Sequence, residues 1–448
     1  MALRRIFTSR TEQQTQKIVI IGIDFGTSFT KVYFNQGGEV KQPIQFEVSG
    51  SKSYFLPTEL YYNPTENKLY FHKDDNCEVL KYFKYSMINE GLLTSKELLQ
   101  KNTAFNIKPE FLCSVYYLAC LIKEVKKQIS GILKTTDIKY TINMGCPVDN
   151  FSDKYKGAYD KAIAVAYQLS DVLTNDGMTI GDLFSYYDSH SQKEIPNIQT
   201  IPELYAEALW FIEQPSTGEG IYTILDIGGG TVDFASIAVS RTKEGEKKTK
   251  IYSQNVMPLG IEILLQYMYP NEYNSKRDAC IEYLKTNNVH MPFGWEPKHN
   301  NNRKLKKAHE FDVKFASGIA EVKERNISLM EEQNSKRKEI PYFSFGGGAD
   351  FNWYHSIIAS HSYAFSKTNI PPLKHKIVQL KDIPHNRLII AEQLTRSSFP
   401  EIEGFPWQFN RKCLFSGIDR DEPFVREAKS DFDLRYELED RQKEIYGD

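Results

Sequence analysis

Cysteine pairs and long apolar runs are absent from this sequence, and neither sign of charge is in excess. Six of its 448 residues are cysteine, and no C-x-x-C pair or obvious set of metal ligands surrounds them: Cys77, Cys113, Cys120, Cys146, Cys280 and Cys413. This usage is not that of a disulfide-rich secreted protein. It favours reduced core thiols in a cytoplasmic protein.

No apolar run approaches the ~20 residues of a membrane-spanning helix, so none is expected. Residues 1–16 hold Arg4, Arg5 and Arg10 but no apolar core. That pattern is not a secretory signal, and we expect a flexible N-terminal tail. The net charge is only −2, so nothing global favours nucleic acid or a membrane surface as a partner.

Aromatic residues, in contrast, are plentiful, with 27 tyrosines and 27 phenylalanines. The hydrophobic content of 41% is that of an ordinary globular protein, and the aromatics favour a β-rich core. The length suits about two to four domains.

The stretch that organises the chain runs from Ile224 to Phe234 (ILDIGGGTVDF). An apolar strand meets Asp226, and a turn of small residues leads to a second strand: Gly228, Gly229, Gly230 and Thr231. Glycine lets backbone N–H groups approach a ligand closely, so the turn suits a phosphate, with Asp226 holding a hydrated metal. Taken alone, the pattern also fits a hairpin that binds nothing.

A near copy of this turn lies about two hundred residues earlier, from Ile20 to Thr30 (IIGIDFGTSFT). Again an apolar strand meets an aspartate, Asp24, and a turn follows with Gly26, Thr27 and Ser28. Two such turns predict two similar lobes that face each other across one phosphate group.

A third glycine turn, Phe343 to Asp350 (FSFGGGAD), follows an apolar strand and opens a helical pattern from Asn352. Its glycines are Gly346, Gly347 and Gly348. A turn at a helix N-terminus suits the sugar–phosphate end of a nucleoside.

In this order and spacing the three turns resemble the two phosphate motifs and the adenosine motif of the actin-like ATPase superfamily. The nearest branch is the nucleotide-binding domain of the seventy-kilodalton heat-shock chaperones, followed by plasmid-segregation and bacterial actins. The resemblance covers about residues 17–397. It implies an α/β fold of two lobes, each a ribonuclease H-like domain, with ATP or ADP and Mg²⁺ in the cleft between them.

The resemblance also implies domain bounds. Lobe I would span 17–215, with a small upper subdomain at about 46–107. Lobe II would span 216–397, with an upper subdomain at about 266–339 and a connecting helix at about 386–397 that returns to lobe I. Residues 398–448 form a charged extension with no pattern of a substrate-binding domain.

Four residues would carry the catalysis in such a protein. The resemblance assigns Asp24 and Asp226 to Mg²⁺, mainly through its waters, and places Glu203 where it orients the attacking water. A lysine near the γ-phosphate would be Lys84, with Lys81 as the alternative and a solvated surface lysine as the plain interpretation. Glu203 also fits a helix N-terminal acid. We expect Glu207, one turn later, on a solvated face or in an interlobe salt bridge.

The adenosine end matches the family less well. Glu321, Arg325 and Ser328 share one face of a helix predicted over 311–330, as the family's adenosine-binding set does. However, Glu324 stands where that set has a lysine. Asp350 stands where the chaperones carry an arginine against the base, so base preference is left open.

Between the turns, periodic patterns predict secondary structure. We expect helices from Pro109 and over 153–169, and a strand over 138–144. Residues 177–199 are polar and predicted to be a loop. The first connecting helix is expected over 201–209.

Three functions fit these observations. The first is a slow ATPase that acts as a chaperone-type switch on a partner protein in trans. The second is a filament-forming actin-like protein, and the third a small-molecule kinase or phosphatase. The basic loops 241–250 and 298–307 are expected to be solvated turns, with a partner or nucleic-acid contact as the alternative for 298–307.

Overall fold

The computed structural model describes residues 17–36, 40–73, 76–87, 95–103, 105–147, 153–192, 195, 197–214, 217–243, 245, 247–268, 277, 279, 281–282, 311, 313–320, 339–365, 373–375, 387–397 and 399. The chain divides into two units, Met1–Asn410 and Arg411–Asp448. All of the described residues belong to the first unit. The expected tail and nearly all of the expected C-terminal extension therefore lie outside them, and the predicted domain bounds stay predictions.

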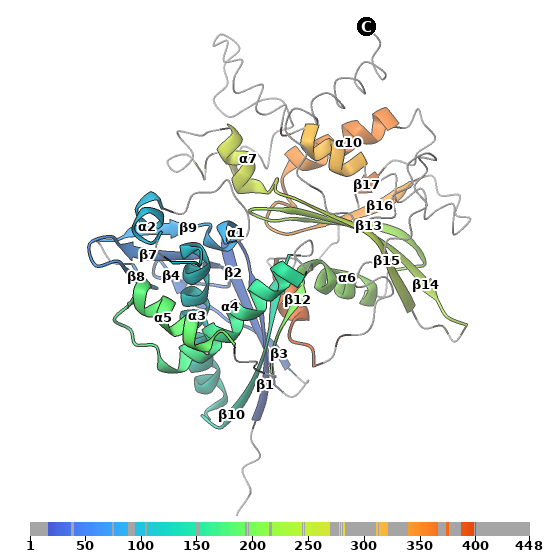
Figure 1. Ribbon diagram of the computed structural model, residues 1–448. Coiled ribbons are helices and arrows are strands. Elements are labelled where there is room, and N and C mark those ends of the chain that lie inside the picture. Colours follow the sequence, from blue (N-terminus) through green and yellow to red (C-terminus); the bar gives the residue numbers. More distant parts are fainter. Residues whose placement is uncertain are drawn as a thin grey trace, which may run out of the picture. The chain divides into compact units, whose positions relative to one another are not determined.

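The first sheet is built on a hairpin, β1 with β2, that carries the earlier of the two aspartate–glycine turns (Figure 1). Its strand order is β12-β10-β1-β2-β3, and the short β6 (Leu56–Pro57) also pairs with β2. The β1–β2 and β2–β3 pairs are antiparallel, whereas β1–β10 and β10–β12 are parallel. The main strands are β1 (Lys17–Phe25), β2 (Phe29–Gln36), β3 (Val40–Pro43), β10 (Ile138–Cys146) and β12 (Ile198–Pro202).

The second sheet repeats this arrangement around the later turn. Its strand order is β15-β14-β13-β16-β17, with antiparallel pairs on one side of β13 and parallel pairs on the other. The strands are β13 (Gly220–Ile227), β14 (Val232–Arg241), β15 (Lys247–Met257), β16 (Ile340–Phe345) and β17 (Leu373–His375). Both sheets therefore have the order third, second, first, fourth, fifth along the chain. This duplication confirms the predicted α/β fold of two ribonuclease H-like lobes.

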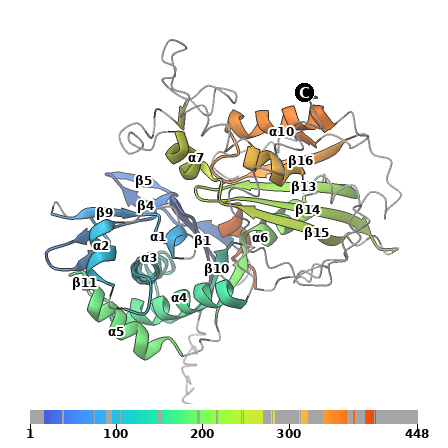
Figure 2. The ribbon, with the colours of Figure 1, turned by 45° about the horizontal axis from the view of Figure 1, so that its top comes forward.

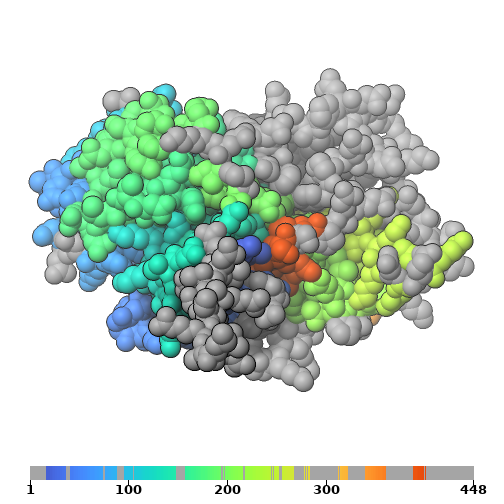
Figure 3. Space-filling model, turned by 90° about the horizontal axis from the view of Figure 1, so that it is seen from below, coloured from blue at the N-terminus to red at the C-terminus, as the bar shows by residue number. Residues whose placement is uncertain are grey.

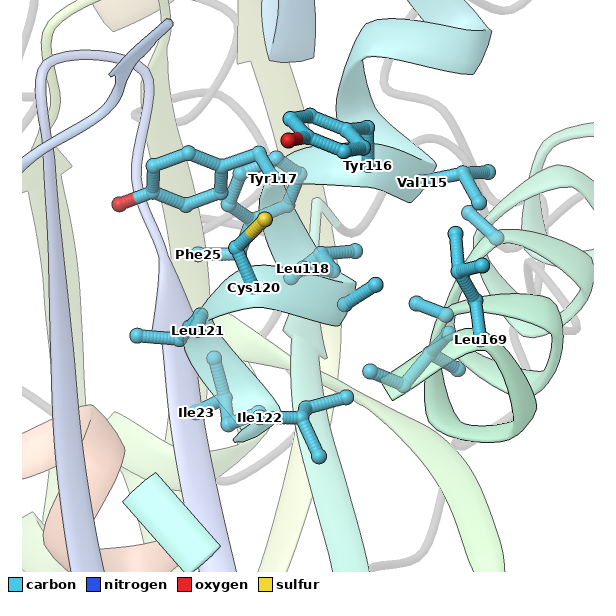
Figure 4. Close-up of a cluster of buried hydrophobic side chains, with 14 of the residues drawn as sticks. Ile23, Phe25, Val115, Tyr116, Tyr117, Leu118, Cys120, Leu121, Ile122 and Leu169 are labelled. Atoms are coloured by element: carbon cyan, nitrogen blue, oxygen red, sulfur yellow. The ribbon is translucent and has the colours of Figure 1, made fainter. Parts of the chain in front are cut away.

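Two long helices cover one face of the first sheet. Helices α3 (Pro109–Leu133) and α4 (Asp153–Val172) begin where the sequence predicts them. Figure 4 shows Ile23 and Phe25 of β1 among side chains of α3, with Leu169 of α4 beside them. Because successive side chains of a strand point to opposite faces, Gly22 and Asp24 point away from this core.

The second sheet has helices on both faces (Figure 2). Helices α7 (Ile261–Met268) and α10 (Asn352–Phe365) share a core with Leu225 and Ile227, while α6 (Glu203–Glu213) shares another with Ile224. Asp226 is on the same face of β13 as Ile224, by the same alternation. Both aspartates of the paired turns thus belong to the strand faces that are turned away from the α3 and α10 cores.

Helices α6 and α11 (Ile389–Gln393) join the two sheets. The two helices contact each other, and α11 also contacts β1. This close approach requires Gly22, because a Cβ there would collide with the carbonyl oxygen of Ala391. In Figure 3 the α11 segment, in orange-red, is visible at the surface of the molecule. The two connecting helices expected from the sequence are both present, although α6 begins at Glu203, after β12.

A third, smaller sheet is antiparallel and has the order β11-β8-β7-β9. It comprises β7 (Glu59–Asn63), β8 (Lys68–Tyr70), β9 (Glu78–Lys81) and β11 (Met178–Thr179), with a two-stranded sheet of β4 (Phe46–Val48) and β5 (Ser51–Ser53) and the short helices α1 (Phe83–Ser86) and α2 (Lys96–Lys101).

The predicted loop over 177–199 is wrong, because this stretch contains helix α5 (Ile180–His190). The helix is capped by Thr179, whose hydroxyl accepts a hydrogen bond from the Asp182 backbone N–H at 3.1 Å. Only Ile180 and Leu183 of this helix are buried. Phe184, Tyr186 and Tyr187 are half-buried against the same core, so the stretch has an amphipathic period that the sequence analysis overlooked among polar residues.

Within the described parts of the chain, no helix is long and apolar enough to cross a membrane.

Candidate functional site

The tips of the two aspartate–glycine turns meet each other. A Cβ at Gly229 would collide with the Ser28 hydroxyl, and a Cβ at Gly230 would lie 3.1 Å from Thr27 Oγ1 and 2.6 Å from the ring of Tyr85. Glycine is therefore needed at these positions for the backbones to approach this closely. The structure brings together the two turns that the sequence identified separately.

The third turn lies against the second. Its strand β16 runs parallel to β13, with Phe345 beside Asp226, and the Gly348 N–H donates to the carbonyl oxygen of Ile227 at 2.9 Å. Gly346 has a φ of +79°, and a Cβ there would collide with an oxygen of Asp226. The second glycine turn thus contacts both the first and the third, so all three predicted turns lie together.

Each of the paired turns places an ionisable residue opposite its aspartate. Asp24 faces Lys31 across the β1–β2 hairpin, and the Lys31 Nζ lies 2.7 Å from Asp24 Oδ2. The equivalent pair in the second hairpin is Asp226 and Asp233, two acids that face each other. The two lobes therefore share a scaffold but differ in charge, since only the first turn neutralises its aspartate with a neighbouring lysine.

Lys84 and Glu203 form a buried ion pair, with 3.1 Å between Nζ and Oε1. Burial lowers the pKa of Lys84, but the carboxylates of Glu203 and Asp24 outweigh this effect and raise it overall. Burial, with the charge of Asp24, raises the pKa of Glu203 overall, although Lys84 lowers it. Room for the glutamate depends on Gly145, where a Cβ would lie 2.8 Å from Glu203 Cγ.

The structure distinguishes the two candidate lysines. Lys84 is buried among the acids of the site, whereas Lys81 is exposed and lies 3.8 Å from Glu59. The alternative interpretation, that Lys84 is a solvated surface lysine, is therefore wrong. Its predicted role near a γ-phosphate stays a prediction.

A cluster of buried carboxyl groups lies around the second turn. Burial, together with the charges of Glu203 and Asp24, raises the pKa of Asp226 to about 7. Burial and the charge of Asp226 also raise the pKa values of Asp233 and Glu207 well above their ordinary range. Three oxygens of this cluster have no hydrogen-bond partner among the described residues: Glu207 Oε2, Asp226 Oδ1 and Asp233 Oδ1.

The expectation for Glu207 is wrong. Its side chain is 1% exposed rather than solvated, and it makes no ion pair within the described part of the chain. Four residues separate it from Glu203 on α6, so both side chains lie on the same helix face, toward the acids. All residues of α6 from Glu203 to Phe211 are buried, so Glu207 is buried with its helix.

The residues present fit a hydrated divalent cation better than a directly bound one. No group of three or more histidine, cysteine or acidic side chains is placed to hold a metal directly, within the residues that the structure describes. The unpartnered oxygens of Asp226 and Asp233 belong to carboxyl groups, which are hard ligands, and Mg²⁺ favours such groups while keeping several of its waters. The roles assigned to Asp24 and Asp226 stay predictions.

The adenosine end is described only in part. Glu321, Arg325 and Ser328 lie outside the described residues. Arg387, which precedes α11, lies near the third turn, 3.6 Å from a Cβ built at Gly347. Its guanidinium carbon is 4.1 Å from the centre of the Phe55 ring, and burial lowers its pKa.

Several site residues were missed by the sequence analysis. Lys31 and Asp233 could have been found, because each follows its aspartate by seven residues on the returning strand of a short hairpin. Glu262 of α7, which accepts a hydrogen bond from the Ser28 hydroxyl at 2.9 Å, and Arg387 could not be found, since each reaches the turns from an element whose packing the sequence does not give.

No protein-family model and no curated protein matches this chain. Among solved structures, it is similar to the crystal structure of MreB5 of Spiroplasma citri bound to ADP, with 12% identity, a TM-score of 0.41 and coverage of 85% of this chain and 95% of that chain. The resemblance to the actin-like ATPase superfamily is confirmed for the fold, on the duplicated strand order. A closer kinship with the heat-shock branch stays a prediction.

Proposed function

We propose that this chain, with the fold of actin-like ATPases, is a Mg²⁺-dependent ATPase that works as a slow switch on a partner protein in trans. The observation that carries the proposal is the contact between two equivalent strand–glycine turns, with a buried lysine–glutamate pair beside them. A hairpin that binds nothing has no need for a second, matching turn at its tip. It also has no need for buried charges beside that tip.

The two turns would hold the β- and γ-phosphates through backbone N–H groups and hydroxyls. Such charge-assisted bonds each contribute about 1.5–3 kcal/mol. The third turn would hold the sugar–phosphate end, at the N-terminus of α10. The residues assigned to these contacts are Gly26, Thr27, Ser28, Gly228, Gly229, Gly230, Thr231, Gly346, Gly347 and Gly348, with Glu321, Arg325 and Ser328 proposed for the adenosine.

The acids of the site favour the binding of a cation. Asp24 is already paired with Lys31, but Asp226 and Asp233 have oxygens without a partner and no neighbouring lysine across the hairpin. A bound Mg²⁺ would neutralise phosphate charge as phosphoryl transfer proceeds. Asp226, with Asp24 opposite, would hold its waters.

Lys84 and Glu203 would carry the chemical step. Glu203 would orient the attacking water, and Lys84 would offset negative charge on the transferring phosphoryl group. Both side chains are buried, so their interactions with charge are stronger than in water. Catalysis of this kind consists mainly of positioning and electrostatics, which is consistent with slow turnover and a conformational output.

The output would be closure of the lobes. A ligand that contacts both turns binds the closed arrangement better than an open one, and only that difference in affinity can shift the population. A hundredfold preference, about 2.7 kcal/mol, is enough to turn a mostly open protein into a mostly closed one.

Turnover of ATP with and without Mg²⁺ tests this proposal. Asp24→Ala and Asp226→Ala should each weaken metal-dependent nucleotide binding and nearly abolish hydrolysis. Asp171→Ala, which removes an exposed acid on α4, is the matched control and should keep full activity. Unchanged turnover in both site variants would contradict the whole assignment.

Two measurements on the wild-type protein separate this proposal from the other functions of the same fold. Sedimentation that requires ATP would indicate a filament. Release of ADP that depends on a sugar or a small acid would indicate a kinase or phosphatase.

A further inference from the structure

The buried carboxylate of Glu262, in the first turn of α7, ties both lobes together at the turns. It accepts a hydrogen bond from the Ser28 hydroxyl at 2.9 Å and one from the Tyr82 hydroxyl at 3.3 Å, both from lobe I. Arg277 donates to the same carboxylate at 2.5 Å. The Glu262 backbone N–H donates to the carbonyl oxygen of Gly229, in the second turn, at 2.8 Å. Glu262 is 1% exposed, and it contacts both turns: its carboxylate bonds to Ser28 and its backbone N–H to Gly229.

We propose that Glu262 is a positioning residue that sets how strongly the site prefers ATP to ADP, by competing with the γ-phosphate for the Ser28 hydroxyl. This inference rests on the proposed function. Ser28 lies at the tip of the first turn, against Gly229 of the second turn. Of the two phosphates that these turns would hold, we place the γ-phosphate at this meeting point, because both turns would contact it there. A serine hydroxyl has one proton to donate, so it serves either Glu262 or a phosphate oxygen at any moment.

The competition is close because both acceptors are charged. A hydrogen bond from serine to a carboxylate and one to a phosphate are of the same charge-assisted kind. When Ser28 turns to the phosphate, Glu262 keeps Arg277 and Tyr82 as donors, so its charge is not left unpaired. Binding of a phosphate to Ser28 therefore breaks the hydrogen bond between Ser28 and Glu262. Only a nucleotide that reaches Ser28 has to break this bond. ADP, which lacks the γ-phosphate, leaves Ser28 with Glu262.

Calorimetric titration of the wild-type chain and its variants with Mg·ATP and Mg·ADP tests this competition. In Glu262→Ala, Ser28 loses the acceptor that it has among the described residues, so the ratio of ATP to ADP affinity should rise about tenfold, equivalent to 1.4 kcal/mol. In the Ser28→Ala background the same substitution should leave the ratio unchanged. An equal change for both nucleotides, or an effect that persists without the Ser28 hydroxyl, would overturn the proposal.

Three further variants separate positioning from folding. Tyr82→Phe removes another donor from the same carboxylate and should leave the ratio unchanged, as should the surface control Asp171→Asn. Glu262→Gln keeps an acceptor without the charge, and it should raise the ratio by about threefold even if the alanine variant does not fold. An unchanged ratio in Glu262→Gln would contradict the competition. Absence of ATP binding by the wild-type chain would instead refute the proposed function itself.

Discussion

Replacing Asp226 with asparagine should stabilise the protein above neutral pH and at the same time remove its Mg²⁺-dependent affinity for ATP. The carboxyl group of Asp226 is buried, and burial together with the charges of Glu203 and Asp24 raises its pKa from 3.8 to about 7. Asparagine has nearly the same shape but no charge to bury. The substitution therefore removes the repulsion between Asp226 and the carboxylates of Glu203 and Asp24, and it leaves the packing in place.

The size and sign of the effect follow from the two pKa values. Between 3.8 and about 7 the folded protein holds a proton on Asp226 that the unfolded chain has lost. The free energy of unfolding therefore falls as the pH rises through this range. The whole difference corresponds to on the order of 4 kcal/mol, reached above pH 7, and to less than half of that at pH 5.

Urea unfolding at about pH 5 and about pH 8 measures this dependence. The advantage of Asp226→Asn over the wild-type protein should be larger at the higher pH. Asp171→Asn, whose acid side chain is 62% exposed, should show no such growth. An Asp226→Asn protein that is no more stable at about pH 8, or equally favoured at both values, would refute the account of the acid cluster.

Three further substitutions and one control variant have defined outcomes. Lys84→Ala should destabilise the fold by about 3–5 kcal/mol in urea unfolding, because it leaves Glu203 buried without its partner, whereas Lys81→Ala should cost less than about 1 kcal/mol. Gly230→Ala forces a methyl group against the Tyr85 ring and should cost about 1–3 kcal/mol and weaken ATP binding in a fluorescence titration. Glu203→Gln should keep ATP affinity but slow single-turnover hydrolysis by about 10²-fold; a lowered melting temperature with an unchanged rate would show that Glu203 only supports its helix.

The elements with strong local patterns were predictable from the sequence. The two aspartate–glycine turns are each defined by a short run of residues, and their likeness to each other predicted a duplicated fold. Helix α3 begins at Pro109, where the sequence predicts it, because its apolar period is long and proline favours the first helical position.

What failed or was missed depends on tertiary packing. The polarity of Glu207 predicts exposure, but α6 packs against both the second sheet and α11, so the acid is buried with it. Helix α5 was missed because its apolar residues, although at helical spacing, stand among polar residues that are typical of a loop. The contact between Glu262 and Ser28 joins residues 234 positions apart, and no local pattern encodes such a pairing.

Hydrogen exchange in the presence of ATP or ADP tests the central claim most directly. If the protein is a switch that closes on the γ-phosphate, ATP with Mg²⁺ should protect residues 26–30, 228–231 and 346–348 more than ADP does. The reason is that both turns would grip a group that only ATP carries. Equal protection by the two nucleotides would contradict the switch and leave a constitutive scaffold or filament subunit as the better account.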